Sequence, residues 1–274
     1  MVKSSPIGVF DSGYGGLTIL KEIEAALPGY DLLYLGDNAR SPYGTRSFET
    51  VYEYTLECVK WLFKSGCPLV ILACNTASAK ALRTIQQKDL PVLFPGKKIL
   101  GVIRPTAEVI GNYSKENKIG ILGTTGTINS LSYVIEINKF FPEAKVIQQA
   151  CPMWVPIIEN NELESAGAQY FYETYVNELL SQEKNIDAVL LACTHYPLIE
   201  HLLRPLLPKK VKLISQGKIV GESLKDYLRR HPEVDEKCSQ NNQLNFFTTD
   251  STVDFDRHST IFYGKEVHSQ HVQV

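Results

Sequence analysis

The 274-residue sequence contains no C-x-x-C pair, no long apolar run and no surplus of basic residues. Its six cysteines are therefore expected to be free thiols, not zinc ligands or the disulfides of a small stapled fold. Apolar stretches such as 69–74 are far too short to span a bilayer. The net charge of −2 argues against a nucleic-acid binder, and the N-terminus lacks the apolar core of a secretory signal. We expect a cytoplasmic protein that binds neither membranes nor nucleic acid.

Short apolar runs alternate with amphipathic stretches along most of the chain. The first run, Ile7–Phe10, precedes a helical pattern over residues 15–27, and the alternation continues to a strand at 244–248 and a last helix. This order predicts an α/β fold of mainly parallel sheets flanked by helices. Ligands in such folds bind beyond the carboxyl ends of the strands. The polar tail with His268 and His271 is expected to be a disordered end, not a metal site.

Two turn-rich stretches divide the chain. Pro-Gly-Lys-Lys at 95–98 and Pro-Lys-Lys at 208–210 both interrupt the strand–helix pattern. We therefore predict a first α/β domain of residues 1–98 plus 210–274 and a second α/β domain of residues 99–209.

The sequence also contains a candidate internal repeat. Val70–Thr76 resembles Val189–His195, and each segment places a cysteine, Cys74 or Cys193, at the end of a buried strand. Two related halves that face each other would explain this match. The alternative is that any two buried strands of an α/β protein look alike.

Two such thiols suit the inversion of a carbon centre. Inversion requires a base that removes a proton from one face and an acid that delivers a proton to the other. A helix N-terminus after each strand would favour the thiolate, and the ordinary thiol pKa of about 8.5 lies near neutrality. Alternatively, a lone cysteine after a buried strand simply fills core. Two cysteines in matching contexts favour the functional interpretation.

Each sulfur needs a polar partner. Asp11, at the tip of the first strand, is the candidate for Cys74, and His195 is the candidate for Cys193. Glu159 is a candidate to orient the imidazole. Alternatively, Asp11 is a turn residue and His195 a structural histidine.

Two polar loops follow predicted strands. Residues 12–16 form a glycine-rich turn that lacks the P-loop and G-x-G-x-x-G patterns, yet free amides at a helix start could hold a carboxylate. In the loop 37–44, Tyr43 and Gly44 could line a pocket. The remaining cysteines are interpreted as structural: Cys58, Cys67, Cys151 and Cys238.

At these residues the sequence resembles the bacterial glutamate racemases. The matching segments, in family order, are 10–17, 36–44, 73–77, 122–128, 150–156 and 192–197. The resemblance implies two α/β domains with the active site between them, often in a homodimer. It also implies interconversion of L- and D-glutamate without pyridoxal phosphate, metal or another cofactor, which supplies D-glutamate for peptidoglycan.

The resemblance further implies residue roles. Cys74 would take the proton from D-glutamate with the help of Asp11, and Cys193 would take it from L-glutamate with His195 and Glu159. The implied substrate contacts are Asp11, Ser12, Tyr43, Gly44, Asn75, Thr76, Thr124, Thr127, Thr194 and His195. One departure is the turn Ser215-Gln216-Gly217, where the family usually has Asp-x-Gly.

Two alternatives stay open at this stage. The chain could be another two-cysteine racemase that acts on aspartate or a hydantoin, because pocket size is not readable from sequence. It could also be a non-catalytic amino-acid-binding protein on the same scaffold, although the presence of both cysteines favours an enzyme.

Overall fold

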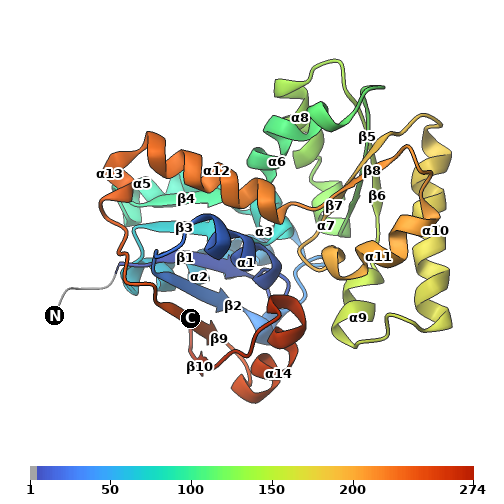
Figure 1. The fold of residues 1–274 in the computed structure, drawn as a ribbon. Coiled ribbons are helices and arrows are strands. Elements are labelled where there is room, and N and C mark those ends of the chain that lie inside the picture. Colours follow the sequence, from blue (N-terminus) through green and yellow to red (C-terminus); the bar gives the residue numbers. More distant parts are fainter. Residues whose placement is uncertain (1–4) are drawn as a thin grey trace.

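The computed structural model describes residues 5–274 and confirms the predicted α/β class. Its strands form two all-parallel sheets (Figure 1). The larger sheet has the order β10 (Ser269–His271), β9 (Leu244–Thr248), β2 (Leu32–Gly36), β1 (Ile7–Asp11), β3 (Leu69–Leu72) and β4 (Lys98–Gly101). The smaller sheet has the order β6 (Lys145–Ala150), β5 (Lys118–Gly123), β7 (Ala188–Ala192) and β8 (Lys212–Ile214).

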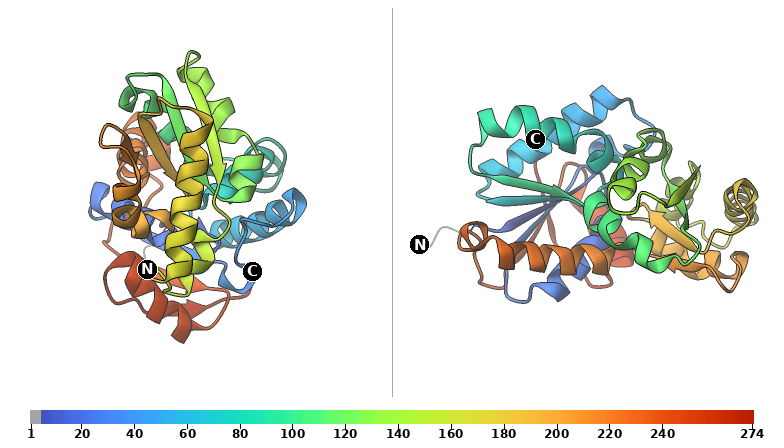
Figure 2. Two further views of the ribbon diagram at one scale, coloured as in Figure 1. Left: turned by 90° about the vertical axis from the view of Figure 1, so that its right-hand side faces the viewer. Right: turned by 90° about the horizontal axis from the view of Figure 1, so that it is seen from above.

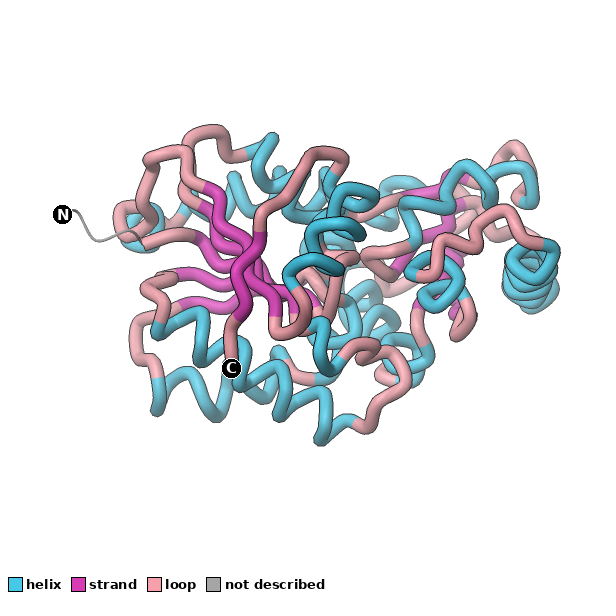
Figure 3. Tube along the Cα trace, turned by 90° about the horizontal axis from the view of Figure 1, so that it is seen from below, coloured by secondary structure: helices cyan, strands magenta, loops and turns pink. Residues whose placement is uncertain are grey.

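Helices cover both faces of each sheet (Figures 2 and 3). The α-helices are α1 (Leu17–Ala26), α2 (Phe48–Lys64), α3 (Asn75–Lys80), α4 (Leu82–Thr84), α5 (Leu90–Leu93), α6 (Ile103–Val109), α7 (Thr125–Asn129), α8 (Ser132–Phe140), α9 (Trp154–Glu159), α10 (Ala166–Gln182), α11 (Glu200–Leu203), α12 (Gly217–Arg230), α13 (Pro232–Asp235) and α14 (Thr252–Tyr263). Short 3-10 turns lie at Asn38–Arg40, Ile110–Tyr113, Tyr196–Ile199 and Arg204–Leu206, and a π-helical turn at Ile85–Asp89.

The helix faces follow from the apolar spacing. In α1, Leu17, Leu20 and Ile23 are buried on one side, and this side joins α12 and α14 in the core over one face of the larger sheet. Helix α2 covers the opposite face, and its N-terminus is capped by Ser47, whose hydroxyl accepts the Thr50 N–H. The strands are thus buried from both sides, as expected for parallel sheets.

The chain crosses between the sheets a few residues later than the sequence indicated. β4 still belongs to the larger sheet, where it pairs with β3, and β8 belongs to the smaller one, where it pairs with β7. The chain therefore crosses between the sheets after Gly101 and after Ile214. The turns at 95–98 and 208–210 come too early, because the strand that follows each turn still pairs within the same sheet. We call residues 5–101 with 215–274 the first lobe and residues 102–214 the second lobe. That these lobes are separate folding domains stays a prediction.

The two sheets share a strand order that matches the predicted repeat. The run β2-β1-β3-β4 in the larger sheet corresponds to β6-β5-β7-β8 in the smaller one. In both runs a cysteine follows the third strand: Cys74 comes shortly after β3 and Cys193 directly after β7.

The prediction of a disordered C-terminus is wrong for the end of the chain. Residues Ser269–His271 form β10, which pairs in parallel with β9, and the Val272 N–H donates to the Thr248 carbonyl oxygen. A three-residue polar strand carries too little apolar pattern to be detected from sequence. Among the described residues, no helix is long and apolar enough to cross a membrane.

Candidate active site

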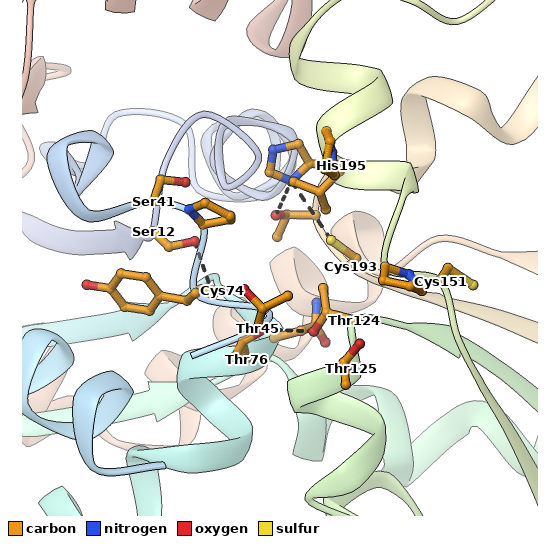
Figure 4. Close-up of a pocket in the computed structure, with 18 residues that line it drawn as sticks. Ser12, Ser41, Thr45, Cys74, Thr76, Thr124, Thr125, Cys151, Cys193 and His195 are labelled. Atoms are coloured by element: carbon orange, nitrogen blue, oxygen red, sulfur yellow. Dashed lines mark hydrogen bonds between the residues drawn. The ribbon is translucent and has the colours of Figure 1, made fainter. Parts of the chain in front are cut away.

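A cavity lies between the lobes, where loops that follow strands of both sheets meet (Figure 4). Its volume is about 70 Å³, which suits a small molecule rather than a nucleotide or a polymer. Cys74 reaches it from the first lobe and Cys193 from the second. The cavity is lined by Ser12, Ser41, Pro42, Tyr43, Gly44, Thr45, Cys74, Asn75, Thr76, Thr124, Thr125, Cys151, Pro152, Val155, Pro156, Cys193, Thr194 and His195.

Cys74 is the N-cap of α3. Its sulfur accepts the Ala77 N–H at 3.4 Å and donates to Ser12 Oγ at 3.6 Å. The sequence predicted that the helix start would favour a thiolate, but burial outweighs these donors and raises the pKa of Cys74 to about 12, with the nearby Asp11 adding to the rise. Near neutral pH Cys74 is therefore a thiol that can act as an acid.

Cys193 has different surroundings. Its sulfur lies 3.9 Å from His195 Nδ1, and the imidazole Nε2 lies 2.9 Å from Glu159 Oε1. Burial lowers the pKa of His195, but the contacts with Cys193 and Glu159 raise it more strongly, to about 10. The imidazole is therefore a cation near neutral pH, and it can donate one N–H to Glu159 and the other toward the sulfur.

The His195 ring is also held by the C-terminal helix. The Phe262 ring of α14 packs against it edge-on, with the ring centroids 5.1 Å apart and an interplanar angle of 81°. Tyr14 of the glycine-rich turn also packs against Phe262, with ring centroids 6.0 Å apart. Carboxylate and aromatic contacts together fix the imidazole beside Cys193.

Asp11 is fully buried behind the cavity wall. Its carboxylate accepts the Gly13 N–H at 3.0 Å and the Thr194 hydroxyl at 3.5 Å. Burial raises the pKa of Asp11, and the His195 cation partly offsets this rise. Within residues 5–274 no hydrogen bond joins Asp11 to Cys74, so its assistance to that thiol stays a prediction.

The glycine-rich turn allows the lobes to approach closely. A Cβ atom on Gly15 would lie 2.3 Å from Thr194 Oγ1 and 2.4 Å from His195 Nδ1. The Thr18 hydroxyl, one turn further, donates to the Thr194 carbonyl oxygen at 2.9 Å. The turn thus packs against the second lobe, and no nucleotide-binding pattern is needed to explain its glycines.

Hydroxyl groups gather at the other end of the cavity. Thr76 Oγ1 lies 2.9 Å from Thr124 Oγ1, and Thr124 donates to Thr127 at 3.1 Å. The Gly126 N–H donates to the Gly44 carbonyl oxygen at 2.7 Å, so backbone from the two lobes meets directly beside this cluster. These groups can bind the oxygens of a carboxylate.

The structure brings the predicted residues together in two layers. Most of them line the cavity, whereas Asp11, Thr127 and Glu159 stand behind the wall and contact residues that line it. The Tyr43 hydroxyl donates to Asp37, so this tyrosine presents its ring and not its hydroxyl.

Sequence reasoning missed part of the wall. Cys151, interpreted as structural, lines the cavity although it is 1% exposed. The other wall residues that were not predicted are Ser41, Pro42, Thr45, Thr125, Pro152, Val155 and Pro156. Several of them lie in segments 36–44 and 150–156, whose position after β2 and β6 was the available signal. Across the described chain no three His, Cys, Asp or Glu side chains gather as metal ligands do.

Comparisons with known proteins point to one family. Residues 7–221 match the family described as Asp/Glu/Hydantoin racemase. A glutamate racemase of Geobacter metallireducens is 38% identical over 94% of this chain and 92% of its own length. The crystal structure of glutamate racemase RacE1 from Bacillus anthracis superposes with a TM-score of 0.89 at 33% identity, covering 99% of this chain and 98% of its own. A Francisella tularensis glutamate racemase in complex with D-glutamate gives 0.86 at 31% identity, covering 99% and 98%.

Proposed function

Because the chain belongs to the Asp/Glu/Hydantoin racemase family, we propose that it interconverts L- and D-glutamate by moving the α-proton between Cys74 and Cys193. One observation carries this proposal: both thiols line a single small cavity, and each comes from a different lobe. The glutamate racemases at 31–38% identity support glutamate as the substrate.

Inversion takes two proton transfers. With L-glutamate, the Cys193 thiolate forms an S–H bond with the α-proton and leaves the electron pair on the α-carbon, where the carboxylate delocalises it. The Cys74 thiol then gives its proton to the opposite face and becomes a thiolate. The product is D-glutamate, and the same two steps in reverse convert it back. The two transfers balance without an oxidant or a reductant, because the electron pair released at the α-carbon takes up the second proton.

The surroundings of the two sulfurs fit these roles in the free enzyme. Cys74 holds its proton, because burial raises its pKa to about 12. The imidazolium of His195 stands beside Cys193 and can stabilise negative charge there. The hydroxyls of Thr76 and Thr124 are placed to bind substrate oxygens, with Thr127 supporting them from behind.

Two cysteine variants test the mechanism. Cys74→Ala and Cys193→Ala each lack one proton carrier, and we expect racemisation, followed by optical rotation without added cofactor, to fall at least about 10²–10⁴-fold. In deuterated solvent, Cys74→Ala should still exchange the α-proton of L-glutamate, and Cys193→Ala that of D-glutamate. Cys238→Ala, which removes a buried thiol with no place on the cavity wall, is the control. Racemisation at the wild-type rate in either cavity variant would contradict the paired role.

A substrate panel separates the remaining alternatives. We expect turnover of glutamate, with aspartate and a hydantoin as controls. Faster turnover of either control would assign the chain to another member of the family. Glutamate binding, measured by calorimetry, without exchange of its α-proton would instead indicate a binding protein.

We also propose that the protein is a cytoplasmic homodimer that supplies D-glutamate for peptidoglycan. Light scattering should give twice the chain mass of 30.8 kDa, and a monomer would contradict the dimer. Cells depleted of the protein should require D-glutamate for growth. Growth without this supplement would contradict the biosynthetic role.

A further inference from the structure

Gln216 occupies the point where the chain returns from the second lobe to the first. It follows β8 and directly precedes α12, in the turn Ser215-Gln216-Gly217. Its side chain is buried at 2% exposure, yet it does not line the cavity. A buried amide needs hydrogen-bond partners, and Gln216 finds them in both lobes.

The partners of Gln216 fix the direction of every hydrogen bond. Thr106 donates its own proton to the Val102 carbonyl oxygen at 2.9 Å, so it can only accept from Gln216 Nε2, also at 2.9 Å. Gln216 Nε2 donates its other hydrogen to the Tyr133 hydroxyl at 2.6 Å. Tyr133 donates in turn to Asn75 Oδ1 at 2.5 Å.

Asn75 closes the ring. Its Nδ2 donates to Gln216 Oε1 at 2.8 Å, so Gln216, Tyr133 and Asn75 form a cycle in which each group donates once to the next. Rotation of the Asn75 amide by half a turn would place its oxygen against the Gln216 oxygen and its nitrogen against the Tyr133 proton. Such a flip would leave buried groups unpaired, which costs about 1–3 kcal/mol for each group.

The ring leaves one Asn75 hydrogen unused. Asn75 lines the cavity, and its second amide hydrogen has no acceptor in the described part of the chain. The orientation set by the ring therefore presents an N–H donor at the cavity wall. A carboxylate is the complementary ligand group for such a donor.

We propose that Gln216 is a positioning residue that locks the Asn75 amide, so that its free N–H binds a substrate carboxylate only when the two lobes are correctly placed. Asn75 belongs to the first lobe and lines the cavity between the lobes, whereas Tyr133 and Thr106 belong to the second lobe. Gln216 links the lobes where the chain returns to the first lobe. Its Nε2 also lies 3.3 Å from the carbonyl oxygen of Val102, the residue at which the chain enters the second lobe. Substrate binding is thereby coupled to lobe placement.

This proposal rests on the proposed racemase function for its substrate. The test uses Gln216→Leu, which keeps the volume but removes the amide. Because a carboxylate contact is made in the ground state and the transition state alike, KM should rise by about 10- to 100-fold for both enantiomers while kcat changes far less. Tyr172→Phe is the control. It removes a different partly buried hydrogen bond, from the Tyr172 hydroxyl to the Leu163 carbonyl oxygen, and neither residue lines the cavity.

The pH dependence of KM in Gln216→Glu separates a positioning role from a merely structural one. The neutral acid can donate one proton and accept another, whereas the carboxylate can only accept. We therefore expect KM of this variant to rise with pH, through an ionisation that the wild type and Tyr172→Phe lack.

An unchanged KM in a folded Gln216→Leu protein, or a KM of Gln216→Glu that follows the wild-type pH profile, would overturn the proposal. Calorimetry of glutamate binding gives an independent measurement. If the wild-type protein binds glutamate without racemising it, the proposed function fails. A weaker affinity in Gln216→Leu would then still support the positioning role, and an unchanged affinity would overturn it.

Discussion

At the scale of single residues, the two cavity thiols are equally buried, but their charged neighbours differ. The Cys74 sulfur accepts one backbone N–H and lies within electrostatic reach of the buried Asp11, whereas Cys193 stands beside a cationic imidazole. Cys74 thus holds its proton in the free enzyme, and the imidazolium of His195 is placed to stabilise negative charge at Cys193. D-glutamate, which needs the Cys74 thiolate, binds productively only to the less populated protonation state.

This asymmetry predicts unequal constants in the two directions. A ligand that needs a minor state binds with an apparent affinity reduced by the population of that state, so KM for D-glutamate should exceed KM for L-glutamate. Enantiomers have equal free energies, so kcat/KM must be equal in both directions. We therefore expect kcat from D-glutamate to be larger by the same factor. Initial rates for each enantiomer, measured by circular dichroism, test this, and equal KM values would contradict it.

The pKa of His195 gives a second prediction at this scale. Removing the carboxylate with Glu159→Gln should lower the pKa of His195 from about 10, by about 1–3 pH units, because an opposite charge at hydrogen-bond distance is lost. NMR titration of the labelled imidazole measures it. Glu162→Gln, an exposed carboxylate nearby, is the matched control. An unchanged His195 titration in Glu159→Gln would show that Cys193 alone sustains the cation.

The same pair predicts how stability depends on pH. The folded pKa of His195 lies above its ordinary value of 6.5, so its contribution to stability is fully present below pH 6.5 and is lost as the pH rises through about 10. The free energy of unfolding, measured by urea titration, should therefore differ most between wild type and Glu159→Gln near pH 6 and converge above pH 10. A constant difference across this range would contradict the linkage.

At the scale of elements, the amphipathic spacing predicted the strands and long helices well. Helix α1 lies within the helical pattern predicted over residues 15–27, and β9 covers the predicted strand 244–248. After Cys74 the helical region begins at Asn75 and breaks into short helical and π-helical turns up to residue 93. Local spacing cannot reveal such breaks, because tertiary packing decides them.

The candidate site was predictable from the sequence only in part. Cys74, Cys193 and His195 could be inferred because cysteine and histidine carry recognisable chemistry after a buried strand. Wall residues such as Pro152 and Val155 are common apolar types with no such signal. Gln216 carried no signal of its own, because the departure from Asp-x-Gly in this turn falls on Ser215, and its hydrogen-bond ring depends on three segments that are distant along the chain.

Helix α14 supplies a prediction about a whole element. Its Phe262 ring contacts His195, whereas Phe255, on the same helix, packs against Tyr14 and Tyr34. Phe262→Leu and Phe255→Leu should each lower the free energy of unfolding by about 0.5–3 kcal/mol. Only Phe262→Leu should also lower kcat, by up to about 10²-fold, because it frees the imidazole. Chemical denaturation and initial rates measure both, and equal losses of kcat would contradict a specific role for this contact.

At the scale of the whole molecule, the cavity exists only where the two lobes meet. Gly44 and Gly126 join across it through their backbones, and Gly15 lets the first lobe reach His195. A ligand that fills this cavity would contact both lobes and so stabilise the contact between them.

Ligand binding should therefore stabilise the entire chain against heat. At a concentration about 100 times Kd, L-glutamate contributes about 2.7 kcal/mol, which corresponds to a rise in Tm of roughly 5–10 °C. Scanning calorimetry on Cys74→Ala, which cannot interconvert the enantiomers, tests L- and D-glutamate separately. L-aspartate at the same concentration is the control. A Tm that glutamate leaves unchanged would contradict a site between the lobes.

The matching strand order of the two sheets has a consequence for stereochemistry. A half-turn rotation, unlike a reflection, is available to a protein made of L-residues, and a half-turn about an axis in the plane of a flattened carbon exchanges its two faces. Two lobes built on one plan, each with a thiol after its third strand, can therefore address mirror-image substrates without any mirror symmetry of their own. The two lobes differ in the neighbours of their sulfurs, because a carboxyl group lies near Cys74 and an imidazole lies beside Cys193.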